Sequence, residues 1–280
     1  MMLTHPLLPA TMEVLHLLTD AGVDFMLIGA QARELLLYHV FDRPQGRATA
    51  DIDIMVLVED WPGYQTLKDT LITASKKVHQ ERQPHRLSYQ VVSDNPNEAP
   101  WRYAIDIIPF GRIENPSGLL QWPPDAAVEM NLAGCREAWA NAVTVKICDT
   151  LTVRCASLPA LALLKLMAWS DRHGDTRRDA EDLLSMLKDY RSTGNEHRIY
   201  DDLPVDLQES LDYDPDLMGA ALLGLDMGRL ATPASMKIVS TLLSEPVSHD
   251  QLERAMHGGI GDKELARRFI SAFREGTDLS

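Results

Sequence analysis

The chain has little positive charge. Of its 280 residues, 27 are lysine or arginine and 41 are aspartate or glutamate, so the formal net charge is −14 at pH 7. A protein that binds a long nucleic-acid duplex needs a broad basic surface to neutralise the phosphates. We therefore do not expect a large duplex footprint. A short or single-ended RNA, held at a local basic patch, stays open.

Cysteines and long apolar runs are also scarce. The three cysteines, Cys135, Cys148 and Cys155, are odd in number and lack metal-ligand spacing. This usage is typical of thiols in a reducing compartment. No apolar segment reaches the length of a membrane span, and no apolar run follows a basic start at the beginning of the chain. We expect a cytoplasmic protein without a signal peptide and without a membrane partner.

What the chain does have is a 45% hydrophobic content, enough for a sizeable core and for two domains. Residues 1–156 interleave apolar runs of strand and helix periodicity, whereas residues 157–280 are almost wholly helical in pattern. The pattern predicts an α/β (α+β) fold: a mixed sheet with flanking helices over 1–156, then an all-helical domain over 157–280. The stretch 191–204 is the best candidate for a long loop or linker.

Hydrophobic periodicity and turn residues give the individual elements. Strands are expected at 25–28, 51–58, 86–92, 102–109, 143–148 and 151–155, with 86–92 and 102–109 as antiparallel neighbours and the last two as a hairpin. Helices are expected at 9–21, 30–40, 61–75, 158–172, 177–190, 205–212, 215–228, 233–244, 248–257 and 262–275. Asp60 is placed to cap the helix that begins at 61.

Three carboxylates lie in apolar strand patterns. Asp51 and Asp53 alternate with Ile52 and Ile54, so both aspartates point to one face of a strand while the isoleucines point into the core. Asp106 lies between two isoleucines in a second apolar run. Carboxylates on such strands are costly unless a cation meets them, and a pair of divalent metals that share phosphate ligands is one solution. A solvated sheet face is the alternative.

Two further features could serve phosphate binding. Gly29 follows a predicted strand and opens a helix, where a glycine lets the backbone approach a phosphate; an ordinary strand-to-helix turn is the alternative. Lys165, between Leu164 and Leu166, could clamp a triphosphate or extend to solvent from a helix edge. Downstream, Asp179 and Asp182 share one helical face. Three nearby arginines could contact phosphates or form surface ion pairs: Arg172, Arg177 and Arg178.

These motifs resemble those of the nucleotidyltransferase superfamily with the polymerase-beta-like fold. The resemblance is carried by Gly29-Ala30, by the run from Arg47 to Asp53, and by the run from Ile105 to Gly111. Within the superfamily the chain is similar to the AbiEii/MenT-like branch over roughly residues 10–190. That branch is known for toxins of toxin–antitoxin systems, and some of its members add nucleotides to tRNA 3′ ends.

The resemblance implies Mg²⁺-dependent transfer of a nucleoside monophosphate from an NTP to an acceptor hydroxyl, with a tRNA 3′ end as the favoured acceptor. It implies a two-metal site on Asp51, Asp53 and Asp106, all three also catalytic, together with Lys165 and Asp182. Nucleotide contacts are expected from Gly29, Ala30, Arg47, Thr49 and Lys165. Ala30 departs from the family pattern, because it stands where Ser or Gly is usual. A cognate antitoxin is the expected protein partner.

Two alternatives stay open. The acceptor could be a protein side chain or a small-molecule hydroxyl, which suits the acidic chain. Convergence of basic residues beside the cleft between the two domains would favour tRNA instead; the candidates are Arg33, Arg43, Arg47 and Arg172. Alternatively, the fold could be a nucleotide-binding or partner-binding module without catalysis. The three intact carboxylates argue against this second alternative.

Overall fold

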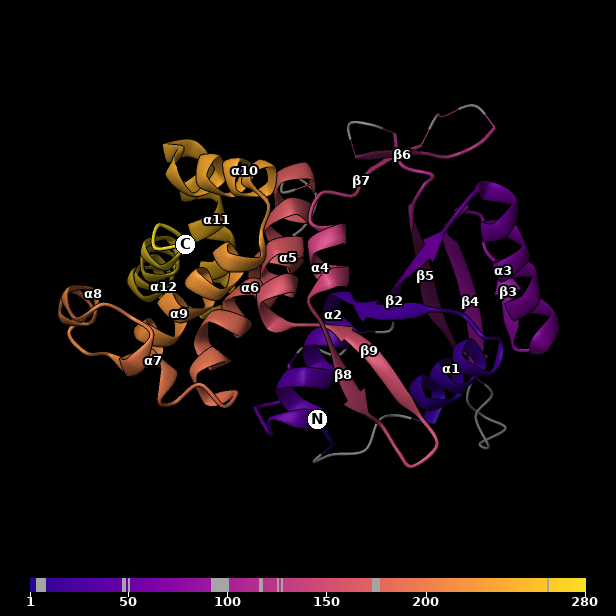
Figure 1. Cartoon of the computed structure of the whole chain (residues 1–280), viewed down its shortest axis with the longest axis horizontal. Coiled ribbons are helices and arrows are strands. Elements are labelled where there is room, and N and C mark those ends of the chain that lie inside the picture. The colour runs from indigo at the N-terminus through magenta and orange to yellow at the C-terminus, as the bar shows by residue number, and fades with distance from the viewer. Residues whose placement is uncertain are drawn as a thin grey trace. The chain divides into compact units, whose positions relative to one another are not determined.

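The computed structural model describes residues 1–3, 9–46, 49, 51–91, 101–115, 118–124, 126, 128–172, 177–260 and 262–280 (Figure 1). The chain forms two compact units. Unit 1 contains residues 1–35, 47–132 and 142–156, and unit 2 contains residues 36–46, 133–141 and 157–280. The two short segments 36–46 and 133–141 therefore belong with the C-terminal helices, although the chain returns to unit 1 after each of them.

Unit 1 is built on a seven-stranded mixed sheet in the order β3-β4-β5-β2-β1-β9-β8. The pairs β2/β5 and β1/β9 are parallel, and the other neighbours are antiparallel. The predicted antiparallel neighbours are confirmed as β4/β5, and the predicted hairpin is confirmed as β8/β9. The strands are β1 (Phe25–Ile28), β2 (Asp51–Val58), β3 (Val78–Gln80), β4 (Arg86–Val91), β5 (Trp101–Gly111), β8 (Ala142–Lys146) and β9 (Thr152–Ala156).

Helices α1 (Pro9–Asp20) and α3 (Trp61–Ala74) contact one face of this sheet. The Thr11 side chain of α1 is hydrogen-bonded to the Tyr103 hydroxyl on β5, and the Tyr64 hydroxyl of α3 donates to the Ile107 carbonyl at 3.0 Å. The strand alternation buries Ile52, Ile54, Ile105 and Ile107 almost completely. The expected cap of α3 is confirmed, because the Asp60 carboxylate accepts from the Gly63 amide at 2.7 Å.

Some short elements of the structure have no counterpart in the sequence prediction. Strands β6 (Leu119–Gln121) and β7 (Glu129–Asn131) form a separate two-stranded sheet, and α4 (Cys135–Ala140) lies in unit 2. Three residues are too few to show a strand period, and six barely exceed one helical turn. The predicted helix 30–40 is divided into α2 (Gly29–Glu34) and a π-helix, η1 (Leu35–Val40).

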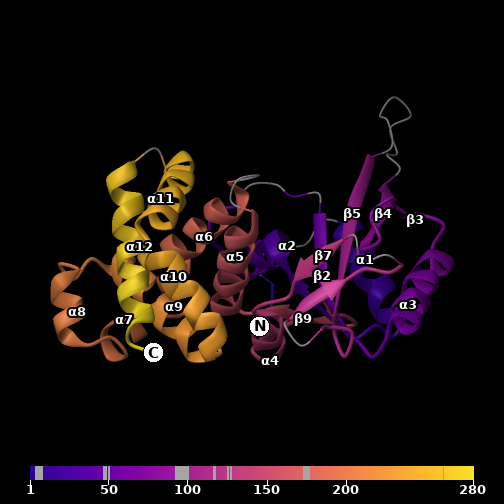
Figure 2. The same ribbon diagram turned by 90° about the horizontal axis from the view of Figure 1, so that it is seen from above.

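Unit 2 is helical, as predicted for the C-terminal part of the chain. Figure 2 shows α5 and α6 next to α9, α10, α11 and α12. The helices are α5 (Leu158–Arg172), α6 (Arg178–Asp189), α7 (Arg198–Asp201), α8 (Val205–Ser210), α9 (Pro215–Leu230), α10 (Pro233–Ser244), α11 (Pro246–Ile260) and α12 (Lys263–Thr277), with a 3₁₀ turn, η2 (Tyr190–Ser192). The expected fold class, a mixed sheet with flanking helices followed by a helical region, is confirmed. Within the described ranges, no helix is long and apolar enough to cross a membrane.

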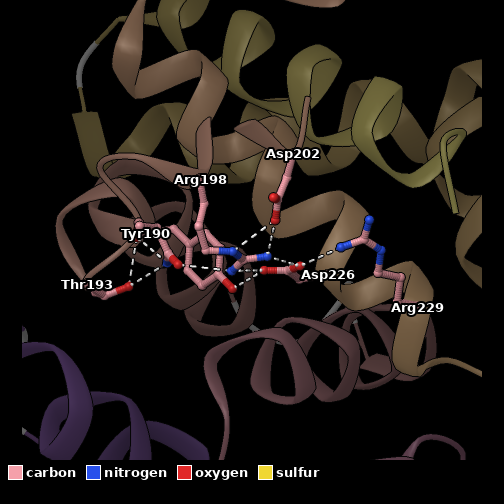
Figure 3. A network of polar contacts seen from close by, with 7 residues as sticks. Tyr190, Thr193, Arg198, Asp202, Asp226 and Arg229 are labelled. Atoms are coloured by element: carbon pink, nitrogen blue, oxygen red, sulfur yellow. Dashed lines mark hydrogen bonds and ion pairs between the residues drawn. The ribbon is translucent and has the colours of Figure 1, made fainter. Parts of the chain in front are cut away.

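The stretch 191–204 is not a linker between the two units, and two short helical segments interrupt the expected loop. This stretch lies inside unit 2 and contributes to η2 and α7. Arg198 forms two hydrogen bonds to Asp226 on α9, at 2.8 and 2.7 Å, and pairs with Asp202; the Tyr190 hydroxyl also donates to Asp226 at 2.5 Å (Figure 3). The polar composition looks like a loop, but here polar side chains bind one another instead of solvent.

Candidate functional site

Three aspartates of unit 1 lie on one face of the sheet, and two of them lie in one row across the strands; we call these three aspartates the carboxylate row. Strand pairing places Ile28 opposite Asp53, Asp53 opposite Asp106, and Asp106 opposite Arg86. Residues that are opposite one another on neighbouring strands point to the same face of a sheet. Asp51 lies two residues before Asp53 and shares that face, which is the reverse of the face contacted by α1 and α3. The sheet thus brings Asp51, Asp53 and Asp106 together.

Arg86 lies opposite Asp106 on the neighbouring strand, and the sequence analysis missed it. Its Nε donates to Asp106 Oδ1 at 2.6 Å and its Nη2 donates to Asp106 Oδ2 at 2.6 Å. These hydrogen bonds are the main reason why the pKa of Arg86 is raised, and the negative charges of Asp51 and Asp53 add to the effect. The signal in the sequence is the arginine that opens the strand 86–91. Its partner depends on the register with β5, which the sequence does not fix.

Gly29 begins α2 directly after β1 and has a positive φ of 68°. A Cβ atom at this position would overlap Oδ2 of Asp53. The glycine is therefore needed for two reasons: the left-handed backbone conformation, and the space taken up by the Asp53 carboxylate. Ala30, the next residue, is buried in α2.

The approach to β2 holds two more of the predicted nucleotide contacts. Thr49 is half-buried, and its hydroxyl accepts a hydrogen bond from the Asp51 amide at 3.3 Å. Thr49 therefore contributes to the backbone conformation at the start of β2. Arg47 lies outside the described residues.

The chemistry of the carboxylate row fits a hard divalent cation. Aspartate oxygens are the ligands that Mg²⁺ prefers, and here they come from adjacent strands in register. In the part of the chain that the structure describes, no group of three or more Asp, Glu, His or Cys side chains is arranged as a metal site. Asp106 instead has both oxygens bound to Arg86. A cation that used Asp106 as a ligand would have to bind beside the positive charge of the guanidinium or displace it.

A second group of predicted site residues lies in unit 2. The Lys165 Nζ is 2.9 Å from Asp179 Oδ1 and 2.6 Å from Asp182 Oδ2. The side chains of the three residues are only 11%, 2% and 4% exposed. Burial alone would lower the pKa of Lys165, but the charges and hydrogen bonds of Asp182 and Asp179 outweigh burial and raise it. Lys165 is therefore a charged lysine held between two carboxylates.

The candidate arginines have separate environments. Arg33 is buried, with its guanidinium 3.8 Å from Glu34, and Arg43 Nε donates to Asp189 Oδ1 at 3.2 Å. Arg177 and Arg178 are exposed at the start of α6. Arg172 is the last residue of α5. The sequence analysis named four arginines whose convergence would favour tRNA as the acceptor. Two of them, Arg33 and Arg43, form ion pairs within their own units.

Two solved structures are similar to the chain at low sequence identity. In solved structures, the chain is similar to an antigenic nucleotidyltransferase-like protein from Paracoccidioides brasiliensis, with 15% identity and a TM-score of 0.43 over 74% of this chain and 89% of that one. It is also similar to JHP933 from Helicobacter pylori, with 15% identity and a TM-score of 0.41 over 96% of this chain and 94% of that one. No curated protein matches the sequence.

The comparison with protein families covers most of the chain. Residues 22–272 match the family described as nucleotidyl transferase AbiEii toxin, type IV TA system. The match includes the carboxylate row of unit 1 and the Lys165 group of unit 2. The chain therefore belongs to the AbiEii family of nucleotidyltransferase toxins.

Proposed function

We propose that this protein transfers a nucleoside monophosphate from an NTP to an acceptor hydroxyl in a Mg²⁺-dependent reaction. The observation that carries the proposal is the register of β2 and β5, which puts Asp53 beside Asp106 with Asp51 on the same face. A bond forms between the acceptor oxygen and the α-phosphorus while the bond from the α-phosphorus to the bridging oxygen breaks, so pyrophosphate leaves.

In this proposal the three aspartates hold two divalent cations. When bound, these cations stabilise the charge on the phosphoryl oxygens. Asp51 and Asp53 would hold both cations, and Asp106 would bind the catalytic cation and help to take up the proton of the acceptor hydroxyl. The backbone at Gly29 and Ala30 receives the triphosphate, with Thr49 and Arg47 as further nucleotide contacts. Residues 1–156 act as the nucleotidyltransferase domain.

We further propose that residues 157–280 act as a helical domain that contributes Lys165 and Asp182 to the same reaction. Lys165 neutralises charge on the β- and γ-phosphates, and Asp182 orients the lysine. The support is that Lys165 is already charged and held in place by Asp179 and Asp182. Its three donors allow a phosphate oxygen to replace one carboxylate contact.

The acceptor that we favour is an RNA 3′ end, in particular that of tRNA, in a toxin setting with a cognate antitoxin as the protein partner. Family membership supports this choice. A protein or small-molecule hydroxyl is the second candidate. It is favoured by the net charge of −14 and by the ion pairs that engage Arg33 and Arg43. All of these substrates occur together with NTPs in the cytoplasm, where we propose that the protein acts.

The test is a transfer assay with each α-labelled NTP, Mg²⁺, total tRNA and the purified protein. We expect label on tRNA with the wild type, and a loss of at least about a hundredfold with Asp51→Asn or with EDTA, because two-metal catalysis needs these carboxylates. The matched control is Asp20→Asn, which makes the same charge change at an exposed position of unit 1 and should transfer label normally.

Each outcome of this assay selects one function. Label on protein or on a small molecule, again lost in Asp51→Asn, would support the second candidate acceptor. Binding of Mg²⁺-NTP without any transfer would support a non-catalytic module. Full activity of Asp51→Asn would contradict the assignment of the carboxylates.

A further inference from the structure

Arg86 binds Asp106 in a two-pronged geometry, whereas many surface ion pairs have a single contact. Two parallel N–H···O hydrogen bonds of 2.6 Å join its guanidinium to both oxygens of Asp106. Charge-assisted pairs of this kind are among the strongest hydrogen bonds in proteins, and they fix the orientation of the carboxylate. Asp106 cannot rotate while the two bonds hold.

The two partners differ in exposure. The side chain of Asp106 is 13% exposed, whereas that of Arg86 is 33% exposed. The guanidinium of Arg86 is already partly hydrated and stays charged at any pH of interest, so moving it away from the carboxylate exposes it to water and buries no charge. Asp106 would lose its counter-ion in the same step. The arginine is therefore the mobile partner, and the carboxylate needs a replacement cation.

The local charge shows what that replacement is. Asp51, Asp53 and Asp106 carry three negative charges on one face, and Arg86 supplies one positive charge to them. A divalent cation at Asp106 would supply two. Each oxygen of Asp106 keeps a second lone pair in the fork, but a cation that approached it would meet the positive charge of the guanidinium, which lies 2.6 Å from both oxygens, and the two charges would repel.

We propose that Arg86 is a positioning residue that competes with the divalent cation for Asp106: it holds this carboxylate in the metal-free protein and is displaced when the cation binds. This inference rests on the proposed function, since it takes Asp106 as a metal ligand. Its consequence is an affinity penalty. If Arg86 holds Asp106 in about nine molecules of ten, the apparent cation affinity is about tenfold lower than that of the open site.

The experiment measures Mn²⁺ binding to the full chain by electron paramagnetic resonance of free Mn²⁺, without nucleotide. We expect Arg86→Gln to bind Mn²⁺ about tenfold more tightly than the wild type, because the competing guanidinium is gone. Arg86→Lys keeps the charge but lacks the fork, so it should bind with intermediate affinity. This second variant also tests the inference if Arg86→Gln does not fold.

The matched control is Arg102→Gln. Arg102 lies four residues before Asp106 on β5, is 55% exposed and pairs with Glu81 at 3.3 Å. Arg102→Gln makes the same charge change as Arg86→Gln, on the strand that carries Asp106, so a general gain in attraction for cations would appear in both variants. We expect the Arg102→Gln affinity to stay within about twofold of the wild type, since exposed charges are screened.

The failures of the two proposals are distinguishable. If Asp51→Asn loses Mn²⁺ binding but the Arg86 variants bind like the wild type, Arg86 does not compete and only the present inference is overturned. Weaker binding in Arg86→Gln would overturn it as well, because the arginine would then support the site. If neither the wild type nor any variant binds Mn²⁺, the carboxylate row does not hold a cation by itself and the present inference is overturned, while the transfer assay with Asp51→Asn decides separately whether the proposed function holds.

Discussion

At the scale of single residues, the carboxylate of Asp53 and the backbone of Gly29 share one small space. The sequence shows both residues but not their contact, because residues 30–52 separate them in the chain. Antiparallel pairing of β1 with β2 brings the end of one strand to the start of the other. From the sequence, Gly29 looks like part of an ordinary strand-to-helix turn. In the structure, a glycine is required there because the Asp53 carboxylate of the candidate site leaves no room for a Cβ atom.

The contact between Gly29 and Asp53 predicts how much an added methyl group at residue 29 lowers the free energy of unfolding. Gly29→Ala combines a positive φ with an overlap with Asp53, whereas Gly22→Ala has a similar φ of 69° but no atom within 4 Å of the added Cβ. We expect Gly22→Ala to lower the free energy of unfolding by about 1–2 kcal/mol and Gly29→Ala by a further 1–3 kcal/mol or so. Urea denaturation of both variants measures the difference. Equal losses would mean that the Asp53 carboxylate does not fill this space.

Lys165 shows what residue-level reasoning leaves open. Its flanking leucines allow either a phosphate clamp or a lysine that extends to solvent. The structure shows a third environment, with the ammonium group buried between Asp179 and Asp182. The helical spacing of the two aspartates was readable from the sequence. The packing of α6 against α5, which brings them to the lysine, was not.

At the scale of elements, the sequence predicted which side chains of a strand share a face, but it did not predict the register between neighbouring strands. The pattern Asp51-Ile52-Asp53-Ile54 predicted one polar and one apolar face, and burial of the isoleucines confirms the apolar face. Arg86 was missed because only the pairing of β4 with β5 assigns it to Asp106. Helix patterns longer than ten residues were predicted well, except 30–40, which the structure divides into α2 and the π-helix η1. The three-residue strands and the polar segment 191–204 gave no usable period.

The packing of α9 against α12 gives an element-scale prediction. A Cβ at Gly224 would overlap the carbonyl oxygen of Phe273, and a Cβ at Gly276 would overlap that of Ala221. Glycine to alanine in an open helix stabilises by about 1 kcal/mol. Here we expect each substitution to destabilise by about 1–3 kcal/mol, because the helices must separate.

The double variant Gly224→Ala/Gly276→Ala sharpens this test. Both methyl groups widen the same crossing, so the second should cost less than the first and the losses should not add. Chemical denaturation of the two single variants and the double variant measures this coupling. A stabilising effect of either single substitution would show that the helices do not approach this closely.

At the scale of the whole molecule, the two compact units are interleaved along the chain. The composition changes near residue 156, yet segments 36–46 and 133–141 belong to unit 2. Their contacts are specific: Arg43 pairs with Asp189, and Glu137 accepts hydrogen bonds from Thr232 and Ser235 at the start of α10. A change in composition marks where most of a unit lies, but it cannot show short segments that join from elsewhere.

Interleaving predicts how fragments behave. A fragment of residues 157–280 lacks Arg43 and Glu137, so we expect faster amide hydrogen exchange at the start of α10 and at the end of α6 than in the full chain. Loss of a charge-assisted hydrogen bond between half-buried or exposed groups costs about 1 kcal/mol, enough to raise local opening several-fold. A fragment of residues 133–280 restores Glu137 and should regain protection in α10 but not in α6. Identical exchange in all three proteins would contradict this arrangement.

The same interleaving sets an order of events during synthesis on the ribosome. Arg43 precedes its partner Asp189 by 146 residues, and Glu137 precedes Ser235 by 98. At about 5–20 residues per second, Arg43 waits roughly 7–30 s for its partner to be translated. Unit 2 cannot be completed before translation of α10, although the strands that carry all three aspartates have been made much earlier. A toxin whose candidate residues Lys165 and Asp182 belong to this late unit would become active only near the end of its own translation.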